Sequence, residues 1–221
     1  MRAMILAAGR GERLRPLTDH TPKPLLKTGK HSLIEHHLYK LAQSGIHDIV
    51  INTAWLGEKI RQTLGNGEKY NLNIHYSDEG SQALETAGGI IKALPLLNDE
   101  PFLIINGDIF TDYDFKQLIE LKIKCEAHLV MVENPDHNHK GDFALENGYL
   151  KNTGDTLYTY SGIGIYTPQF FSGYAEGIRA LAPILKEKMA QHKVSGELYK
   201  GEWTDVGTAE RLQQLYNQLN S

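Results

Sequence analysis

Residues 3–14 read Ala-Met-Ile-Leu-Ala-Ala-Gly-Arg-Gly-Glu-Arg-Leu, and the interpretation of the whole chain starts from this stretch. The apolar run 3–8 predicts a short buried strand, which the glycines at 9 and 11 end sharply. Because glycine has no Cβ, the backbone amides of such a loop can approach a phosphate closely. The stretch is therefore a candidate nucleotide site.

Helical and strand patterns alternate after this opening strand. Strands are expected at 46–53, 72–77 and 101–106, and helices at 33–42, 56–64, 86–94 and 113–122. This alternation is typical of an α/β fold in which helices cover both faces of a mostly parallel sheet. Ligands of such folds bind at the carboxyl ends of the strands.

The pattern changes from about residue 127 to short apolar runs joined by tight turns. The runs 130–132, 143–145, 149–150 and 156–166 predict a small inserted antiparallel layer. A helix at 177–190, a strand at 202–205 and a helix at 208–219 then return to the α/β pattern. Since no repeat or long linker interrupts the sequence, we expect a single domain over residues 1–221.

Composition limits the possible partners and compartments. The chain has 23 Lys or Arg and 27 Asp or Glu, and the formal net charge of −4 argues against broad nucleic-acid binding. Its one cysteine, Cys125, cannot form an internal disulfide and fits a reducing cytoplasm. No apolar run reaches the roughly 18 residues of a membrane span. We expect a soluble cytoplasmic protein, without membrane or nucleic-acid partners, as a monomer or weak homo-oligomer.

Two common phosphate-binding motifs do not fit. A dinucleotide-binding loop needs a third glycine where Leu14 stands and a helix where Pro16 stands, which disfavours an NAD-dependent oxidoreductase. A Walker A loop fails because His31 follows Gly29-Lys30 and Pro24 replaces the first glycine.

Local charge supports the glycine loop as a phosphate site. Five basic residues fall between positions 10 and 27, namely Arg10, Arg13, Arg15, Lys23 and Lys27. Arginine can clamp phosphate oxygens with two hydrogen bonds and lysine acts as a point charge, so this run suits a polyphosphate. A solvated basic loop is the alternative.

Residues 6–26, LAAGRGERLRPLTDHTPKPLL, resemble the L-A-A-G-x-G-x-R-L-x-P-L-T and P-K-P signature of the sugar-1-phosphate nucleotidyltransferases. The resemblance implies a Rossmann-like three-layer αβα fold whose glycine loop wraps a nucleoside triphosphate. It also implies that Arg13 and Lys23 are the catalytic basic pair. Nucleotide contacts are then expected at Ala7, Ala8, Gly9, Gly11, Glu12, Arg13, Lys23, Ala83, Thr86 and Gly88.

Two acids follow strands that lie far apart in the sequence. Asp108 comes after the apolar strand 101–106, where carboxylate oxygens can hold Mg²⁺ together with substrate phosphates; a plain turn is the alternative. Asp205 lies in the stretch 202–208, EWTDVGT, in which Thr208 is placed to cap the last helix and Asp205 could belong to that cap. The resemblance implies that Asp108 and Asp205 hold Mg²⁺.

The stretch 81–90, SQALETAGGI, narrows the choice of substrate within this family. Much of the family has a glycine where this chain has Glu85, and the form here resembles the short uridylyltransferases that act on N-acetylmuramic acid 1-phosphate in cell-wall sugar recycling. The resemblance implies transfer from UTP to that sugar phosphate, with release of pyrophosphate. Three alternatives stay open: guanylyl transfer to mannose or heptose 1-phosphate, thymidylyl or uridylyl transfer to glucose 1-phosphate, and a catalytically silent regulatory subunit.

The resemblance divides the chain into a mainly nucleotide-binding part (1–125), a mainly sugar-binding lobe (126–200) and a closing segment (201–221). It implies sugar contacts at Asn106, Gly141, Asp142 and Ser161, although ordinary turn and strand roles are equally open. His137 and His139 lack a third ligand at suitable spacing for a transition metal, so we expect them in a solvated loop.

Overall fold

The computed structural model describes residues 1–220. Its strands are β1 (Ala3–Leu6), β2 (Asp48–Thr53), β3 (Asn73–Asp78), β4 (Phe102–Asn106), β5 (Ile109–Thr111), β6 (Ala127–Val132), β7 (Phe143–Glu146), β8 (Tyr149–Lys151), β9 (Leu157–Tyr166), β10 (Val194–Tyr199) and β11 (Trp203–Asp205). One sheet has the order β3-β2-β1-β4-β9-β6-β10-β8-β7, and β11 pairs with β5 in a second, two-stranded sheet.

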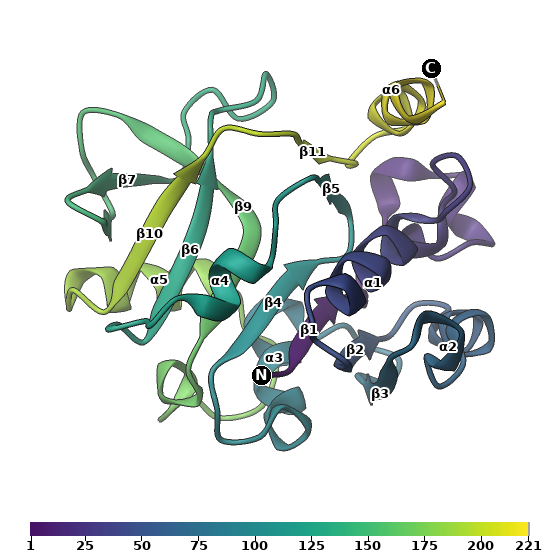
Figure 1. The fold of residues 1–221 in the computed structure, drawn as a ribbon, viewed down its shortest axis with the longest axis horizontal. Helices are drawn as coiled ribbons and strands as arrows, with labels where there is room; N and C mark the ends of the chain where they lie inside the picture. The colour runs from purple at the N-terminus through teal and green to yellow at the C-terminus, as the bar shows by residue number, and fades with distance from the viewer. Residues whose placement is uncertain (221) are drawn as a thin grey trace.

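The α-helices are α1 (Leu33–Gln43), α2 (Gly57–Leu64), α3 (Glu85–Leu97), α4 (Lys116–Glu120), α5 (Leu181–Ala190) and α6 (Ala209–Leu219). Figure 1 shows α1 and α4 in front of the large sheet and α3 and α5 behind it. Among the described residues, no helix has the length and apolar character needed to cross a membrane.

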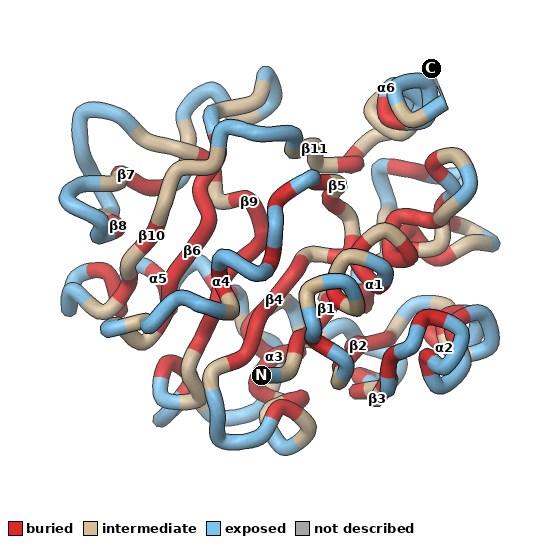
Figure 2. The backbone as a smooth tube through the Cα atoms, in the orientation of Figure 1, coloured by how far each residue is buried: buried red, intermediate tan, exposed pale blue. Residues whose placement is uncertain are grey.

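Alternate residues of β1 pack into two hydrophobic cores, one on each face of the sheet. Ala3 and Ile5 pack with α1, whereas Met4 packs with α3 and α5. Since side chains alternate across a strand, this pattern places β1 in the middle layer of three. Figure 2 shows burial along all of β6 and along most of β4 and β9. The expected α/β fold, with helices on both faces of a mixed sheet, is confirmed.

The sheet changes direction at β9. Strands β1, β2, β3 and β4 are parallel, while β9 runs antiparallel to both β4 and β6. The strands of the second half therefore continue the main sheet rather than forming a separate layer. β10 (Val194–Tyr199), which the sequence pattern did not indicate, lies parallel to β6. Its glycine and half-exposed polar residues interrupt the apolar alternation on which strand prediction depends.

Helix α5 begins four residues later than expected. Residues 177–180 are not helical; the Arg179 amide donates to Leu84 O at 2.9 Å, and Arg179 O accepts from the Ala87 and Gly88 amides. The segment thus supplies partners for amides at the start of α3, which a helix leaves unpaired. This contact competes with helix formation in 177–180 and cannot be seen in local sequence.

Candidate active site

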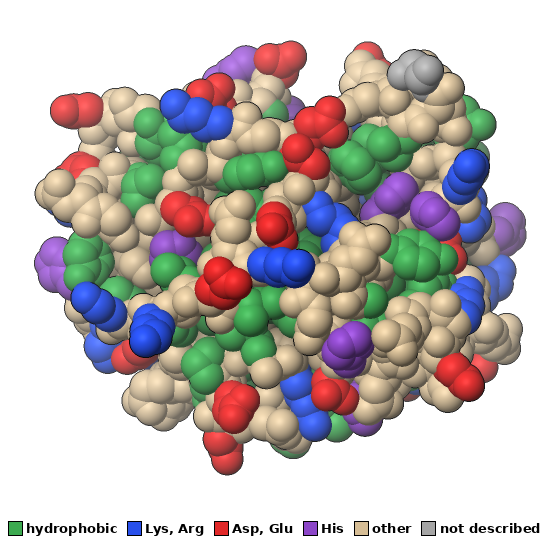
Figure 3. Space-filling model, in the orientation of Figure 1, with side chains coloured by type: hydrophobic (Ala, Val, Ile, Leu, Met, Phe, Trp, Pro, Cys, Tyr) green, Lys and Arg blue, Asp and Glu red, His purple; other side chains and the backbone are tan. Residues whose placement is uncertain are grey.

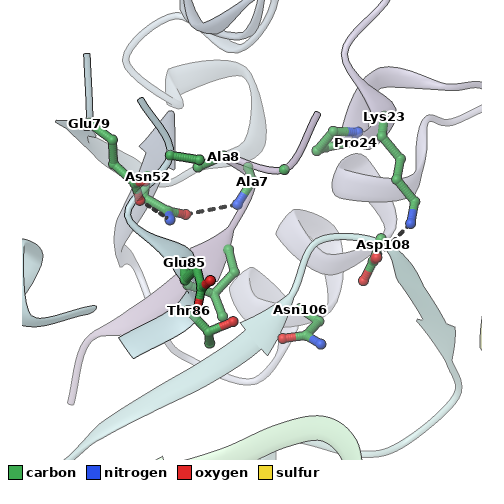
Figure 4. Close-up of a pocket in the computed structure, with 13 residues that line it drawn as sticks. Ala7, Ala8, Lys23, Pro24, Asn52, Glu79, Glu85, Thr86, Asn106 and Asp108 are labelled. Atoms are coloured by element: carbon green, nitrogen blue, oxygen red, sulfur yellow. Dashed lines mark hydrogen bonds and ion pairs between the residues drawn. The ribbon is translucent and has the colours of Figure 1, made fainter. Parts of the chain in front are cut away.

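A first cavity of about 210 Å³ opens at the carboxyl ends of β1 and β4 (Figure 4). Eight residues expected in the site line it: Ala7, Ala8, Gly9, Lys23, Ala83, Thr86, Asn106 and Asp108. They come from the ends of two parallel strands, the loop after β1 and the start of α3. This is the edge of an α/β sheet at which ligands bind.

Two further cavities adjoin the first. A second cavity of about 310 Å³ is lined by the expected residues Gly9, Gly11, Glu12, Arg13, Lys23 and Asp108. A third cavity of about 380 Å³ is lined by the expected residues Arg13, Asn106, Asp108, Asp142, Ser161 and Asp205. Asp108 lines all three cavities and therefore lies at their junction.

The two glycines of the loop differ in the space around them. Gly11 has φ +67°, and a Cβ there would lie 3.0 Å from Thr18 Cγ2 and 3.2 Å from the Cβ of Lys23. A side chain at this position would strain the backbone and press on Lys23. Gly9 has nothing within 4 Å of its Cβ position, so it leaves the space over the loop open.

Three of the five bases in this loop region are engaged elsewhere. Arg10 and Arg15 each reach Asp19 Oδ1 at 2.8 Å, and the Arg10 guanidinium holds the pKa of Asp19 below its usual value. Arg10 also stacks on Trp55, with 3.8 Å between Cζ and the ring centroid. Lys27 pairs with Glu35 at 3.0 Å. None of these three residues lines the three cavities, so the structure does not bring the whole basic run together around them.

Arg13 and Lys23 are the two bases of this run that line the cavities. Lys23 Nζ lies 2.5 Å from Asp108 Oδ2, and the lysine side chain is 9% exposed, against 37% for the aspartate. An ammonium that is this buried needs a charged partner. The pair places one positive and one negative group at the junction of the cavities.

The two distant acidic motifs meet through β5 and β11. Asp205 pairs with Ile109 in the two-stranded sheet, and the Val206 amide donates to Asp108 O at 2.9 Å. Thr208 caps α6, since its Oγ1 accepts from the Arg211 amide at 3.3 Å. Asp205 is therefore not needed as the cap, and its carboxylate lies on the third cavity together with Asp108.

The Asp205 carboxylate has unexpected neighbours. Arg211 Nη1 donates to Asp205 Oδ2 at 3.0 Å, and His137 Nε2 lies 3.0 Å from the same oxygen. His137 and His139 both lie on an exposed loop, as expected, but the ring of His137 also contacts the Asp205 carboxylate, which the sequence did not indicate. Among residues 1–220, no group of three or more His, Cys, Asp or Glu could hold a metal ion by itself.

Two buried polar residues of the first cavity were missed by sequence reasoning (Figure 4). Asn52 Oδ1 accepts from the Ala7 amide at 2.8 Å, and its Nδ2 donates to Glu79 Oε1 at 2.6 Å. Glu79 Oε2 accepts from the Leu84 amide at 2.7 Å. This chain of hydrogen bonds connects β1 to the segment before α3. Asn52 lies near the end of β2 and Glu79 directly follows β3, so the rule that ligands bind at strand ends could have found them.

Four expected residues have other roles in the structure. Gly88 and Gly141 do not line the three cavities; a Cβ at Gly88 would collide with Gly177 O, and one at Gly141 would lie 2.6 Å from Leu157 O. Asp142 Oδ2 accepts from the Tyr160 amide at 2.8 Å, and Ser161 Oγ donates to Val130 O at 2.7 Å. The last two line the third cavity but already use these groups within the protein.

Glu85 lines the first cavity. Its φ is +57°, in the left-handed region that favours glycine. The chain therefore accepts backbone strain at a cavity residue.

Comparisons with known proteins agree with this geometry. A family model described as nucleotidyl transferase matches residues 2–155. The N-acetylmuramate alpha-1-phosphate uridylyltransferase of Neisseria meningitidis serogroup B is 50% identical over 97% of this chain and 96% of its own length. A mannose-1-phosphate guanyltransferase of Yarrowia lipolytica is 34% identical over 94% of this chain, which spans 61% of that protein.

The fold is also found among solved structures. A crystal structure of a Bacillus anthracis protein has a TM-score of 0.87 at 24% identity, covering 99% of this chain and 95% of that one. The structural likeness supports the α/β fold. The family match and the 50% sequence identity to the Neisseria relative show which family the chain belongs to. The chain belongs to the nucleotidyl transferase family and is an enzyme of that class.

Proposed function

We propose that this enzyme transfers a uridylyl group from UTP to N-acetylmuramic acid 1-phosphate, forming a nucleotide sugar and releasing pyrophosphate. The observation that carries the reaction type is the position of Asp108, where the glycine-loop cavities meet the third cavity. Two phosphorylated substrates can therefore meet beside one carboxylate and one buried lysine. The choice of UTP and of the sugar rests on the relative with 50% identity.

The proposed reaction needs no general base, because the phosphate of the sugar is already ionised at neutral pH. The work of the protein is to align two polyanions and to reduce their repulsion. We assign Lys23 to the α-phosphate and the sugar phosphate, and Arg13 to the leaving pyrophosphate; both residues line the second cavity. Charge stabilisation of this kind acts most strongly where donors are fixed before the substrate arrives.

The residues present fit a divalent cation, which we propose to be Mg²⁺. Asp205 Oδ1 is buried without a hydrogen-bond partner, and Asp108 lines the same cavity. Hard carboxylate oxygens suit Mg²⁺, which takes its remaining ligands from phosphates and water. When bound, Mg²⁺ would neutralise phosphate charge and orient the oxygens. Asp108 and Asp205 would hold it.

The three parts of the chain divide the proposed work. Residues 1–125 supply the nucleotide side, with Ala83, Thr86, Asn52 and Glu79 around the first cavity. Residues 126–200 supply Asp142 and Ser161 on the sugar side, and residues 201–221 supply Asp205. Ser161 Oγ already donates a hydrogen bond to Val130 O. We therefore assign the sugar contact first to Asn106, which lines the same cavity.

We further propose that the enzyme acts in the cytoplasm, in the recycling of cell-wall sugars, as a monomer or weak homo-oligomer. The single cysteine and the phosphorylated substrates support this setting. Acidic and basic side chains of residues 1–220 are interspersed on the face shown in Figure 3. A mixed surface of this kind differs from the basic stripe of a nucleic-acid-binding protein.

Guanylyl transfer to mannose 1-phosphate is the second candidate, favoured by the 34% identical relative. The silent regulatory subunit is not retained as a candidate, because the chain belongs to an enzyme family and Arg13, Asp108 and Asp205 all line the third cavity. Mass spectrometry after incubation with UTP, N-acetylmuramic acid 1-phosphate and Mg²⁺ tests the proposal. The expected product is the uridine diphosphate sugar, made by the wild type and not by Asp108→Asn. Nucleotide binding without any product would contradict the proposed substrates.

A further inference from the structure

The two carboxylate oxygens of Asp205 have different surroundings. Oδ2 faces Arg211 Nη1 and His137 Nε2, each at 3.0 Å. Oδ1 is buried and has no hydrogen-bond partner. Buried carboxylate oxygens are normally satisfied, so an unpartnered one beside a cavity indicates an unfilled ligand position.

The His137 ring contacts both Asp205 and Arg211. Its Nε2 lies 3.0 Å from Asp205 Oδ2, to which a proton on Nε2 can be donated, and Arg211 Nη1 lies 2.9 Å from both ring nitrogens. The carboxylate, the imidazole and the guanidinium are therefore in mutual contact. His137 comes from the loop after β6 and Arg211 from the first turn of α6, so two distant segments fix one carboxylate oxygen.

Gly207 gives the guanidinium its position. A Cβ at Gly207 would collide with Arg211 Nη2 and would lie 2.9 Å from Asp205 Oδ1. The Arg211 Nε also lies 3.4 Å from Thr208 Oγ1, the residue that caps α6. The start of α6 therefore places Arg211 against Asp205 Oδ2 and leaves Oδ1 without a hydrogen-bond partner.

We infer that Arg211 and His137 are positioning residues for Asp205, which occupy Oδ2 and thereby present Oδ1 as the single oxygen for a divalent cation. The inference rests on the proposed metal role of Asp205. Partners that orient a metal ligand restrict its rotation, and removing them typically weakens metal affinity about 10–100-fold.

Mn²⁺ binding to the full chain tests the inference without turnover. Free Mn²⁺ is measured by electron paramagnetic resonance as Mn²⁺ is titrated into the protein, with and without UTP. The variants are Arg211→Gln, Arg211→Lys, His137→Ala, His137→Gln and Asp205→Asn. Arg61→Gln is the matched control, because it removes an arginine–aspartate pair of 2.8 Å, to Asp78, that lies outside the three cavities.

Arg211→Gln is expected to weaken Mn²⁺ binding about tenfold, with Arg211→Lys intermediate. His137→Ala should also weaken it, and His137→Gln should restore part of the affinity because its amide can donate to Oδ2. Arg61→Gln should bind as the wild type does. His137 is on an exposed loop, so its two variants keep the test valid if Arg211→Gln unfolds.

Unchanged Mn²⁺ binding in Arg211→Gln and His137→Ala would overturn the inference, since the two residues would then have no effect on the cation site. Tighter binding would also overturn it, since the two residues would then compete with the cation for Asp205. Wild-type binding of Mn²⁺ that does not depend on Asp205, with or without UTP, would overturn it as well. Failure of the proposed substrates is seen separately, as absence of the nucleotide sugar while Mn²⁺ binding persists.

Discussion

Lys23 Nζ lies 2.5 Å from Asp108 Oδ2, and this ion pair joins residues that are 85 positions apart. The lysine is almost buried, while the aspartate is open to all three cavities. In the protein without substrate, Asp108 thus balances the charge of Lys23. Substrate phosphates can take over that role, which places the ammonium where charge changes during the reaction.

Lys23→Ala is expected to lower kcat about 10²–10³-fold while changing nucleotide affinity only a few-fold. Donors aimed at developing charge act mainly in the transition state, so their loss appears in kcat. Single-turnover pyrophosphate release gives the rate, and calorimetry with UTP gives the affinity. A variant with near-normal kcat and much weaker UTP binding would reduce Lys23 to a ground-state contact.

Asn52→Ala is expected to destabilise the protein by about 1–3 kcal/mol and to raise KM for UTP. The change leaves the Ala7 amide without its acceptor and removes a donor from the buried Glu79 carboxylate. Urea unfolding and steady-state kinetics measure the two effects. Wild-type stability together with wild-type KM would show that this hydrogen-bond chain does not shape the first cavity.

Glu85→Gly is expected to raise Tm by about 2–4 °C, because it relieves roughly 1 kcal/mol of strain at φ +57°. Glu85→Ala is the matched control: it removes the carboxylate but keeps a Cβ in the left-handed region, so its Tm should stay near that of the wild type. Differential scanning calorimetry compares the three proteins. Equal Tm in both variants would mean that the strain is absent.

His37 makes stability depend on pH. The side chain is buried, and burial lowers the pKa from 6.5 to about 4. Below pH 6.5 the His37 imidazole is protonated in the unfolded chain but stays neutral in the folded protein. The free energy of unfolding therefore falls as pH decreases from 6.5 towards 4, by up to about 3 kcal/mol. Stability is full above pH 6.5.

Chemical denaturation between pH 7 and 5 measures the His37 effect, with His37→Gln as the control. The pKa of Glu35 is held at about 2 by donors that include Ser32 and Lys27, although burial opposes them, so that carboxylate titrates below this range. The pH slope should be smaller in His37→Gln than in the wild type. Parallel slopes in the two proteins would contradict the assignment.

The sequence indicated the site wherever a short motif ends a strand. Asp108 and Asp205 were located in this way because the carboxyl end of a strand determines where the next residue points. The roles of Arg10 and Lys27 could not be read from the sequence, because every base in a run looks equally available until its partner is placed.

Long-range contacts account for the remaining differences. His137, Asp205 and Arg211 come from two segments 68 or more residues apart, and their spacing gives no sign of a meeting. Asn52 and Glu79 look like ordinary strand-end residues until β1, β2 and β3 align. Gly88 resembled a nucleotide contact, but its amide bonds to Arg179 O. All of these contacts depend on tertiary packing, which local sequence patterns do not encode.

The most direct test of the proposed function is kcat/KM for pyrophosphate release across UTP, GTP, dTTP and CTP, each paired with N-acetylmuramic acid, mannose and glucose 1-phosphates. The account predicts that UTP with N-acetylmuramic acid 1-phosphate gives the highest value. The highest value for GTP with mannose 1-phosphate, or no release with any pair, would contradict it.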